Sequence, residues 1–125
     1  MNMVTRLAPR RTDAALDLEA LKALEDALGP DECAELVDDG LLEATDRLVA
    51  IERALEEESW SRLGRLAREL ALIAPRIGLT SLALQAEALE DCCQCLDRTA
   101  AHAVGQRLLR CGEAALSASL LRPAG

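Results

Sequence analysis

Two cysteines, Cys92 and Cys95, are separated by two residues, which is the spacing of one half of a zinc site. A complete site would need further ligands, and Cys111 or His102 would have to supply them. The chain has five cysteines, an odd number, and three of them crowd together, so the sequence does not predict a disulfide framework. We therefore expect reduced thiols that pack as small hydrophobic side chains, with no bound metal and no cofactor.

A group of arginines is the second feature that could do chemistry, because guanidinium groups bind carboxylates through paired hydrogen bonds. These arginines lie in residues 60–77, which we predict to form one helix. At 100° per residue, the large apolar side chains of this helix, except Leu72, fall on one side. The other side carries Ser61, Gly64, Arg65, Arg68, Leu72, Pro75 and Arg76. The pattern therefore predicts that Arg68 faces solvent.

This arginine-rich side contrasts with the rest of the protein, which has 22 acidic and 14 basic residues and a net charge of −8. Leu72 lies among the arginines and makes an apolar spot with a charged rim, a common form of protein-binding surface. Gly64 costs the helix about 0.5–1 kcal/mol relative to alanine, and the pattern shows no packing reason for it. The plain alternative is a solvated face that binds nothing.

Several classes of function are disfavoured by composition. The negative net charge would repel DNA or RNA, and no apolar run approaches the length of about 18 residues that suggests a membrane span. The sequence has no glycine-rich phosphate loop and no recognisable Ser-His-Asp set, so we expect no enzyme active site of these kinds. The first twelve residues carry Arg6, Arg10 and Arg11 without an acid, and we expect a flexible tail there. A cytoplasmic protein is the resulting prediction.

The composition predicts an all-α protein, since Ala, Leu, Glu and Arg dominate and aromatic residues make up only 1%. Apolar periodicity predicts helices over residues 17–28, about 30–57 and 60–77, one from Thr80 with inward positions through Leu96, and one from Asp97 with inward positions through Ala115. Because the connections are short, we expect an antiparallel four-helix bundle, with the short first helix covering one end. The predicted domain covers residues 16–121, between tails of residues 1–15 and 122–125.

Residue types at the predicted helix ends agree with these boundaries. Four residues can act as N-caps, and they are Asp17, Ser59, Thr80 and Asp97. Pro30 suits the first turn of the second helix, and Gly78 suits the left-handed residue that commonly follows a helix.

The third and fourth predicted helices resemble histidine-containing phosphotransfer (HPt) domains. The usual pattern of that family is Ala-His-x-Leu-Lys-Gly-x-Ala, followed by Gly four residues on, then Leu and later a Leu-Glu pair. This sequence has Ala67-Arg68-Glu69-Leu70-Ala71-Leu72-Ile73-Ala74, then Gly78, Leu82, Ala86 and Leu89-Glu90. The apolar and glycine landmarks match in register, and the helix order matches over nearly the whole chain after the tail. The resemblance implies a helical bundle of bacterial phosphorelay signalling.

The departures from the family pattern fall on its functional positions. Arg68 stands where the family has the phosphate-accepting histidine, Ala71 replaces a lysine, and Leu72 replaces a glycine. Arginine stays protonated in proteins and has no lone pair for a phosphoryl group, so phosphotransfer at this position is excluded. The resemblance therefore implies a non-phosphorylatable module that docks on a receiver domain or a histidine kinase. The residues expected at the interface are Gly64, Arg65, Arg68, Leu72 and Arg76.

Two other functions stay open at this point. His102, the only histidine, lies in Ala101-His102-Ala103-Val104, which loosely imitates the motif, and it could be the phosphoacceptor of a working phosphotransfer protein. However, only nine residues follow Leu116, too few for the two helices expected after the histidine helix. The third reading is a dimerising helical adaptor whose fold merely resembles HPt, and the oligomeric state is left open.

Overall fold

The computed structural model describes residues 18–120, and within that range all regular structure is helical, which confirms the all-α class. The elements are α2 (Leu18–Leu28), α3 (Pro30–Glu56), α4 (Trp60–Ile73), the 3₁₀ helix η1 (Ala74–Ile77), α5 (Thr80–Gln94) and α6 (Arg98–Leu120). The predicted tails of residues 1–15 and 122–125 and the predicted cap Asp17 lie outside the described residues.

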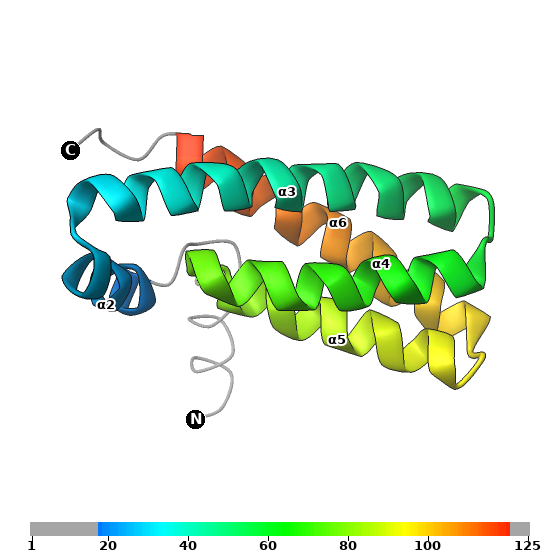
Figure 1. Ribbon diagram of the computed structural model, residues 1–125. Helices are drawn as coiled ribbons and strands as arrows, with labels where there is room; N and C mark the ends of the chain where they lie inside the picture. The colour runs from blue at the N-terminus through cyan, green and yellow to red at the C-terminus, as the bar shows by residue number, and fades with distance from the viewer. Residues whose placement is uncertain (1–17, 121–125) are drawn as a thin grey trace, which may run out of the picture.

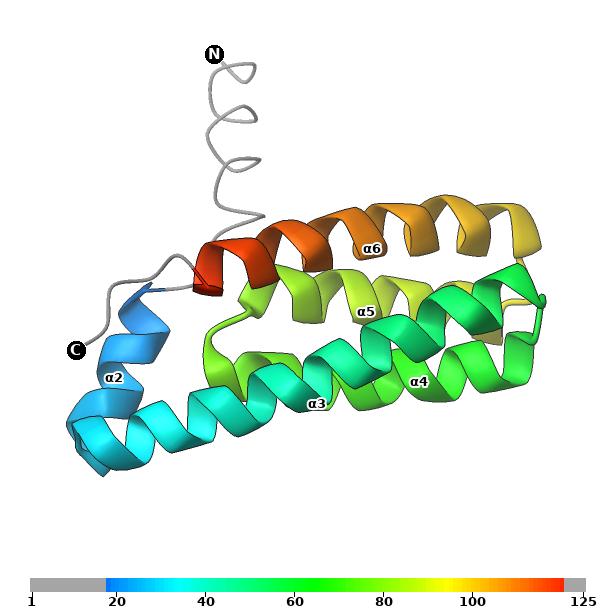
Figure 2. The same cartoon turned by 90° about the horizontal axis from the view of Figure 1, so that it is seen from above.

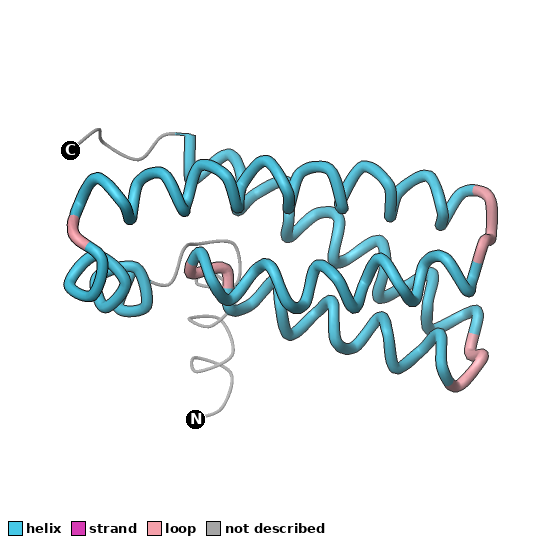
Figure 3. The backbone as a smooth tube through the Cα atoms, in the orientation of Figure 1, coloured by secondary structure: helices cyan, strands magenta, loops and turns pink. Residues whose placement is uncertain are grey.

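The helices α3, α4, α5 and α6 lie side by side, and each runs opposite in direction to the one before it (Figures 1 and 2). Helix α4 packs against α3 and α5, and α6 packs against α5 and α3. The short helix α2 lies crosswise at the end of the molecule where α3 begins (Figure 2). Only short loops connect the helices (Figure 3), so each helix packs on its neighbour in the chain.

The core between these helices is almost entirely aliphatic. Its largest fully buried side chains are Val37, Ile51, Leu55, Leu63, Leu70, Ile77, Leu79, Leu82, Leu89 and Leu108. Burying each of these stabilises the fold by about 1.5–3 kcal/mol relative to leaving it exposed. The predicted apolar stripe of α2 is wrong at Leu18 and Leu28, whose side chains are 71% and 38% exposed. The predicted inward position of Leu96 is also wrong, because its side chain is 80% exposed. For Leu96 the reason is that α5 ends at Gln94, two residues earlier.

Two glycines of α6 let this helix approach α3 closely. A Cβ atom on Gly105 would lie 2.9 Å from Cδ2 of Leu55, and one on Gly112 would lie 2.7 Å from Cδ1 of Leu48. The two glycines are seven residues apart, as are the two leucines, so each leucine packs onto one glycine along the antiparallel helix pair.

The three connections between α3, α4, α5 and α6 each turn through a residue with positive φ, namely Glu58 (55°), Gly78 (78°) and Leu96 (57°). In each, the next N–H donates back across the turn: Ser59 to Ala54 (2.9 Å), Leu79 to Ala74 (2.9 Å) and Asp97 to Cys92 (3.0 Å). This is the hydrogen-bond pattern of a helix end that stops in the left-handed region. The prediction for Gly78 is confirmed, whereas the other two turns lack the expected glycine.

The predicted helix over residues 60–77 is confirmed as far as Ile73 and then tightens into η1. Pro75 explains the change, because it has no N–H to donate to the carbonyl four residues earlier. Asp97 is confirmed as a cap, since its Oδ1 accepts a hydrogen bond from the N–H of Ala100 at 3.1 Å. The predicted caps Ser59 and Thr80 are wrong: Ser59 makes no side-chain cap hydrogen bond, and Thr80 is already the first residue of α5.

We expect Gly112→Val to lower the free energy of unfolding by about 1–3 kcal/mol, because its side chain would overlap that of Leu48. Urea denaturation followed by circular dichroism measures this change. The control is Gln106→Val, at an exposed position of the same helix, where the loss should stay below about 0.7 kcal/mol. Equal losses in the two variants would contradict the proposed close contact.

Candidate functional site

An open groove of about 340 Å³ lies between the first part of α4 and the last part of α5. Its lining residues are Trp60, Ser61, Gly64, Arg65, Arg68, Glu90, Cys93, Gln94 and Leu96. Three of the five residues expected at an interface therefore line the groove, namely Gly64, Arg65 and Arg68. Leu72 and Arg76 do not line it, although both are exposed, and Arg76 belongs to η1 rather than to α4.

The arginines of this face differ in their partners. The exposure predicted for Arg68 is confirmed, and among residues 18–120 neither Arg68 nor Arg65 has an ion-pair partner. By contrast, Arg62 lies 3.9 Å from a carboxylate oxygen of Glu57. Elsewhere, the Nε of Arg47 on α3 donates to Oε1 of Glu69 on α4 at 2.8 Å. The guanidinium groups of Arg65 and Arg68, which line the groove, thus stay available in a protein of net charge −8.

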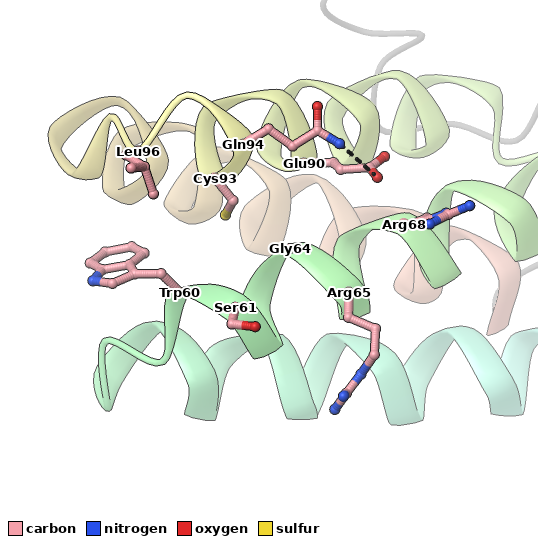
Figure 4. Close-up of a pocket in the computed structure, with 9 residues that line it drawn as sticks. All are labelled: Trp60, Ser61, Gly64, Arg65, Arg68, Glu90, Cys93, Gln94 and Leu96. Carbon is pink, nitrogen blue, oxygen red and sulfur yellow. Dashed lines mark hydrogen bonds between the residues drawn. The ribbon is translucent and has the colours of Figure 1, made fainter.

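Gly64 has a packing role, so its interpretation as an outer-surface glycine without a packing reason is wrong. It is half-buried, and a Cβ atom there would lie 3.2 Å from Cβ of Cys93 on α5. The helical pattern could not show this, because the residue that Gly64 faces belongs to another helix. In Figure 4, Gly64 and Cys93 lie opposite each other in the middle of the groove.

Trp60 and Leu96 face each other at one end of the groove (Figure 4). Trp60 is half-buried, and the ring of His102 meets it edge-on, with centroids 5.2 Å apart and planes at 86°. The guanidinium carbon of Arg98 lies 5.9 Å from the centroid of the Trp60 ring, within the range of a cation–π contact. Two residues of α6 therefore fix the orientation of the indole ring.

Leu96 is a functional candidate that the sequence analysis missed. Its left-handed conformation costs a residue other than glycine about 1–2 kcal/mol, and its 80% exposed side chain gains little burial in return. Such unrelieved strain is more common where a side chain has a function. The one signal in the sequence is that no glycine occurs in the junction between α5 and α6, where a helix end usually needs one.

The thiols beside the groove are held in the protonated form. Burial raises the pKa of Cys92, and the charges of Asp97, Cys95 and Asp91 raise it further. Burial also raises the pKa of Cys93, with smaller contributions from Cys92 and Glu90. Since the thiolate is the reactive form, these are weak nucleophiles and weak metal ligands. Within residues 18–120, no three His, Cys, Asp or Glu residues lie close enough together to hold a metal ion.

His102 is about half exposed and lies on α6, outside the lining of the groove. Its Nε2 lies 3.5 Å from Oε2 of Glu58. A phosphoryl group on Nε2 would meet this carboxylate, and two negative charges at that distance repel each other. The geometry at Nε2 therefore disfavours His102 as a phosphoacceptor.

Comparison with known proteins found no match among protein-family models, curated proteins or solved structures. Between residues 18 and 120, none of the helices has both the length and the apolar character needed to cross a bilayer. The groove has two cations without an ion-pair partner among residues 18–120, Arg65 and Arg68, and an exposed apolar end at Leu96.

We expect Leu96→Gly to raise the free energy of unfolding by about 1 kcal/mol, because glycine adopts positive φ without the steric penalty. The matched control is Leu84→Gly, at another exposed leucine, in the interior of α5, where glycine should lower the stability by about 1 kcal/mol. Urea denaturation measures both. If both variants were less stable than the wild type, the claim that the positive φ of Leu96 is strained would be wrong.

The raised thiol pKa values predict that the stability falls at alkaline pH. The ordinary pKa of a cysteine thiol is 9.0, and above this pH the unfolded chain releases the protons of Cys92 and Cys93. The native state still holds them there, because both pKa values are raised. This stabilisation is therefore fully present at neutral pH and is lost as the pH rises through the raised values. Urea denaturation at pH values from neutral to above 9.0 measures the free energy of unfolding. This free energy should decline less with pH in the double variant Cys92→Ala/Cys93→Ala than in the wild type. An unchanged decline would exclude these thiols as its cause.

Proposed function

We propose that this protein is an HPt-like docking module of bacterial two-component signalling, which binds a receiver domain or a histidine kinase without carrying phosphate. The observation that carries the proposal is the state of Arg68, which is exposed and without an ion-pair partner among residues 18–120. Arg68 also stands at the position where the HPt landmarks place the phosphoacceptor. In this proposal α3 to α6 form the antiparallel four-helix bundle of an HPt domain, and the protein acts in the cytoplasm.

The chemistry of arginine separates docking from transfer. Its guanidinium keeps its proton, so it cannot form the covalent bond to phosphorus that a histidine nitrogen forms. It can still pair with two carboxylate oxygens at once through parallel N–H donors. Receiver domains have acidic residues around their phosphoacceptor aspartate, which is the charge that an unpaired arginine would attract. The expected product is a complex in which no phosphoryl group moves.

The residues around Arg68 support a protein partner rather than a small anion. Leu72 follows one turn later on α4 and is 59% exposed, so it offers apolar contact area beside the charge. Arg65 on α4 and Arg76 in η1 are also exposed, so they add positive charge to the surface of this part of the chain. An apolar spot with a cationic rim fits the composition of transient protein interfaces.

The charge distribution also bears on the rate of association. The protein has a net charge of −8, so an acidic partner meets overall repulsion except at a positive patch. The positive patch would orient the partner as it approaches. Salt would weaken this attraction, because exposed charges are screened over about 8–10 Å at physiological ionic strength. The rate of association at the proposed docking face should therefore fall strongly as the salt concentration rises.

We expect Arg68→Glu to weaken the binding of a receiver domain by about tenfold or more, because it replaces an attraction by a repulsion. Calorimetric titration against a panel of purified receivers measures the affinity. Arg107→Glu is the matched control, because it makes the same change at an exposed arginine of α6. Equal affinities for the wild type and Arg68→Glu across the panel, or phosphate transferred to the wild type from a phosphorylated receiver, would refute the proposal.

A further inference from the structure

We infer that the groove between α4 and α5 binds a partner helix with a large apolar side chain at the Trp60–Leu96 end and a carboxylate at Arg68. This inference rests on the proposed function and deepens it, because it specifies the chemistry and the spacing of the partner segment. The occupant is an acidic amphipathic helix of another protein. Three features of the groove favour this occupant: the spacing of residues along α4, the apolar end and the charged end.

The spacing follows from the register of α4. Trp60, Gly64 and Arg68 are four residues apart, so they follow one another turn by turn along the groove. In Figure 4, Trp60 lies near one end and Arg68 near the other. Eight residues at a rise of 1.5 Å separate their backbone positions by about 12 Å. Two turns of a partner helix span about 11 Å, so its apolar residue and its carboxylate should lie seven or eight positions apart.

The apolar end of the groove is arranged to receive a side chain. His102 and Arg98 already hold the indole ring of Trp60 in one orientation, so little freedom remains to be lost on binding. Leu96 faces it across the groove and is 80% exposed, in a left-handed conformation that glycine would adopt at lower cost. Between the two ends, Gly64 packs against Cys93 of α5, so no side chain of α4 projects from this position into the groove.

The charged end favours an acidic occupant. Arg68 has no ion-pair partner within the described part of the chain. Glu90 lies on the α5 side, where Nε2 of Gln94 donates a hydrogen bond to its Oε2 at 3.5 Å. A carboxylate from a partner is thus attracted toward the α4 side, where the arginines are, and repelled from the α5 side. One carboxylate at a defined place suits this arrangement better than a densely charged polyanion.

The test uses Trp60 as its own reporter, because it is the only tryptophan and the chain has no tyrosine. The probes are two synthetic helical peptides of identical composition. In one, a leucine and a glutamate lie seven positions apart on the same face; in the other, the glutamate lies on the opposite face. We expect the first peptide to change the emission of Trp60 saturably and to bind about tenfold more tightly than the second. Equal binding of the two peptides would overturn the inference.

Variants identify the anchors. Leu96→Ala and Arg68→Glu should each weaken binding of the first peptide by about tenfold, while Leu84→Ala, at an exposed leucine outside the groove, should leave it unchanged. Circular dichroism checks that each variant is folded. An unchanged affinity in Leu96→Ala would overturn the inference. So would inorganic phosphate that alone reproduces the fluorescence change, because the groove would then be a site for a small anion.

Receiver binding separates this inference from the proposed function. If Arg68→Glu weakens a receiver complex and Leu96→Ala does not, docking stands and the helix-binding groove is refuted. If the peptides bind as expected and no receiver binds, the groove stands and the signalling role is refuted. Self-association that depends on protein concentration and is removed by Leu96→Ala would assign the groove to a second copy of this chain and refute the inference of a helix from another protein.

Discussion

The contact of α4 with α5 at Gly64 and Cys93 sets the form of the candidate site. Because Gly64 has no side chain, the two helices approach closely there. A Cβ atom added to Gly64 would lie only 3.2 Å from Cβ of Cys93. On one side of this contact lie Trp60 and Leu96, and on the other lies Arg68 (Figure 4). A larger residue at position 64 would separate the helices or fill the groove between them. The arginines would then remain, but without the groove that they line.

Sequence reasoning succeeded where one helix determines the outcome. The apolar period predicted the helices, most of their inward positions and the exposure of Arg68, because these depend on the angle of 100° between successive residues of a single helix. It failed where two helices meet. The packing of Gly64 depends on Cys93, which is 29 positions away, and the exposure of Leu96 depends on where α5 stops.

The helix ends also divide into those that the sequence predicted and those that it did not. Gly78 acts through its own backbone chemistry, and its left-handed stop was predicted from the sequence, whereas the tightening of the last turn at Pro75 was not predicted. Ser59 fails as a cap because its hydroxyl makes no hydrogen bond to the free N–H groups of α4. Glu58 and Leu96 adopt left-handed conformations that neither residue favours. Each conformation is accompanied by a backbone hydrogen bond that closes the helix end, and the propensity of the residue itself does not predict it.

The three tight turns at Glu58, Gly78 and Leu96 also determine how stiff the molecule is as a binding surface. Each turn is closed by a backbone hydrogen bond of 2.9–3.0 Å across the helix end, so the connections contain almost no loose chain. The helices therefore have little room to shift along one another, and side chains on α4 keep a constant height relative to α5. A rigid surface loses little conformational entropy when it associates. Selectivity would then come from whether a partner already has the matching shape, since this protein has little capacity to adapt to it.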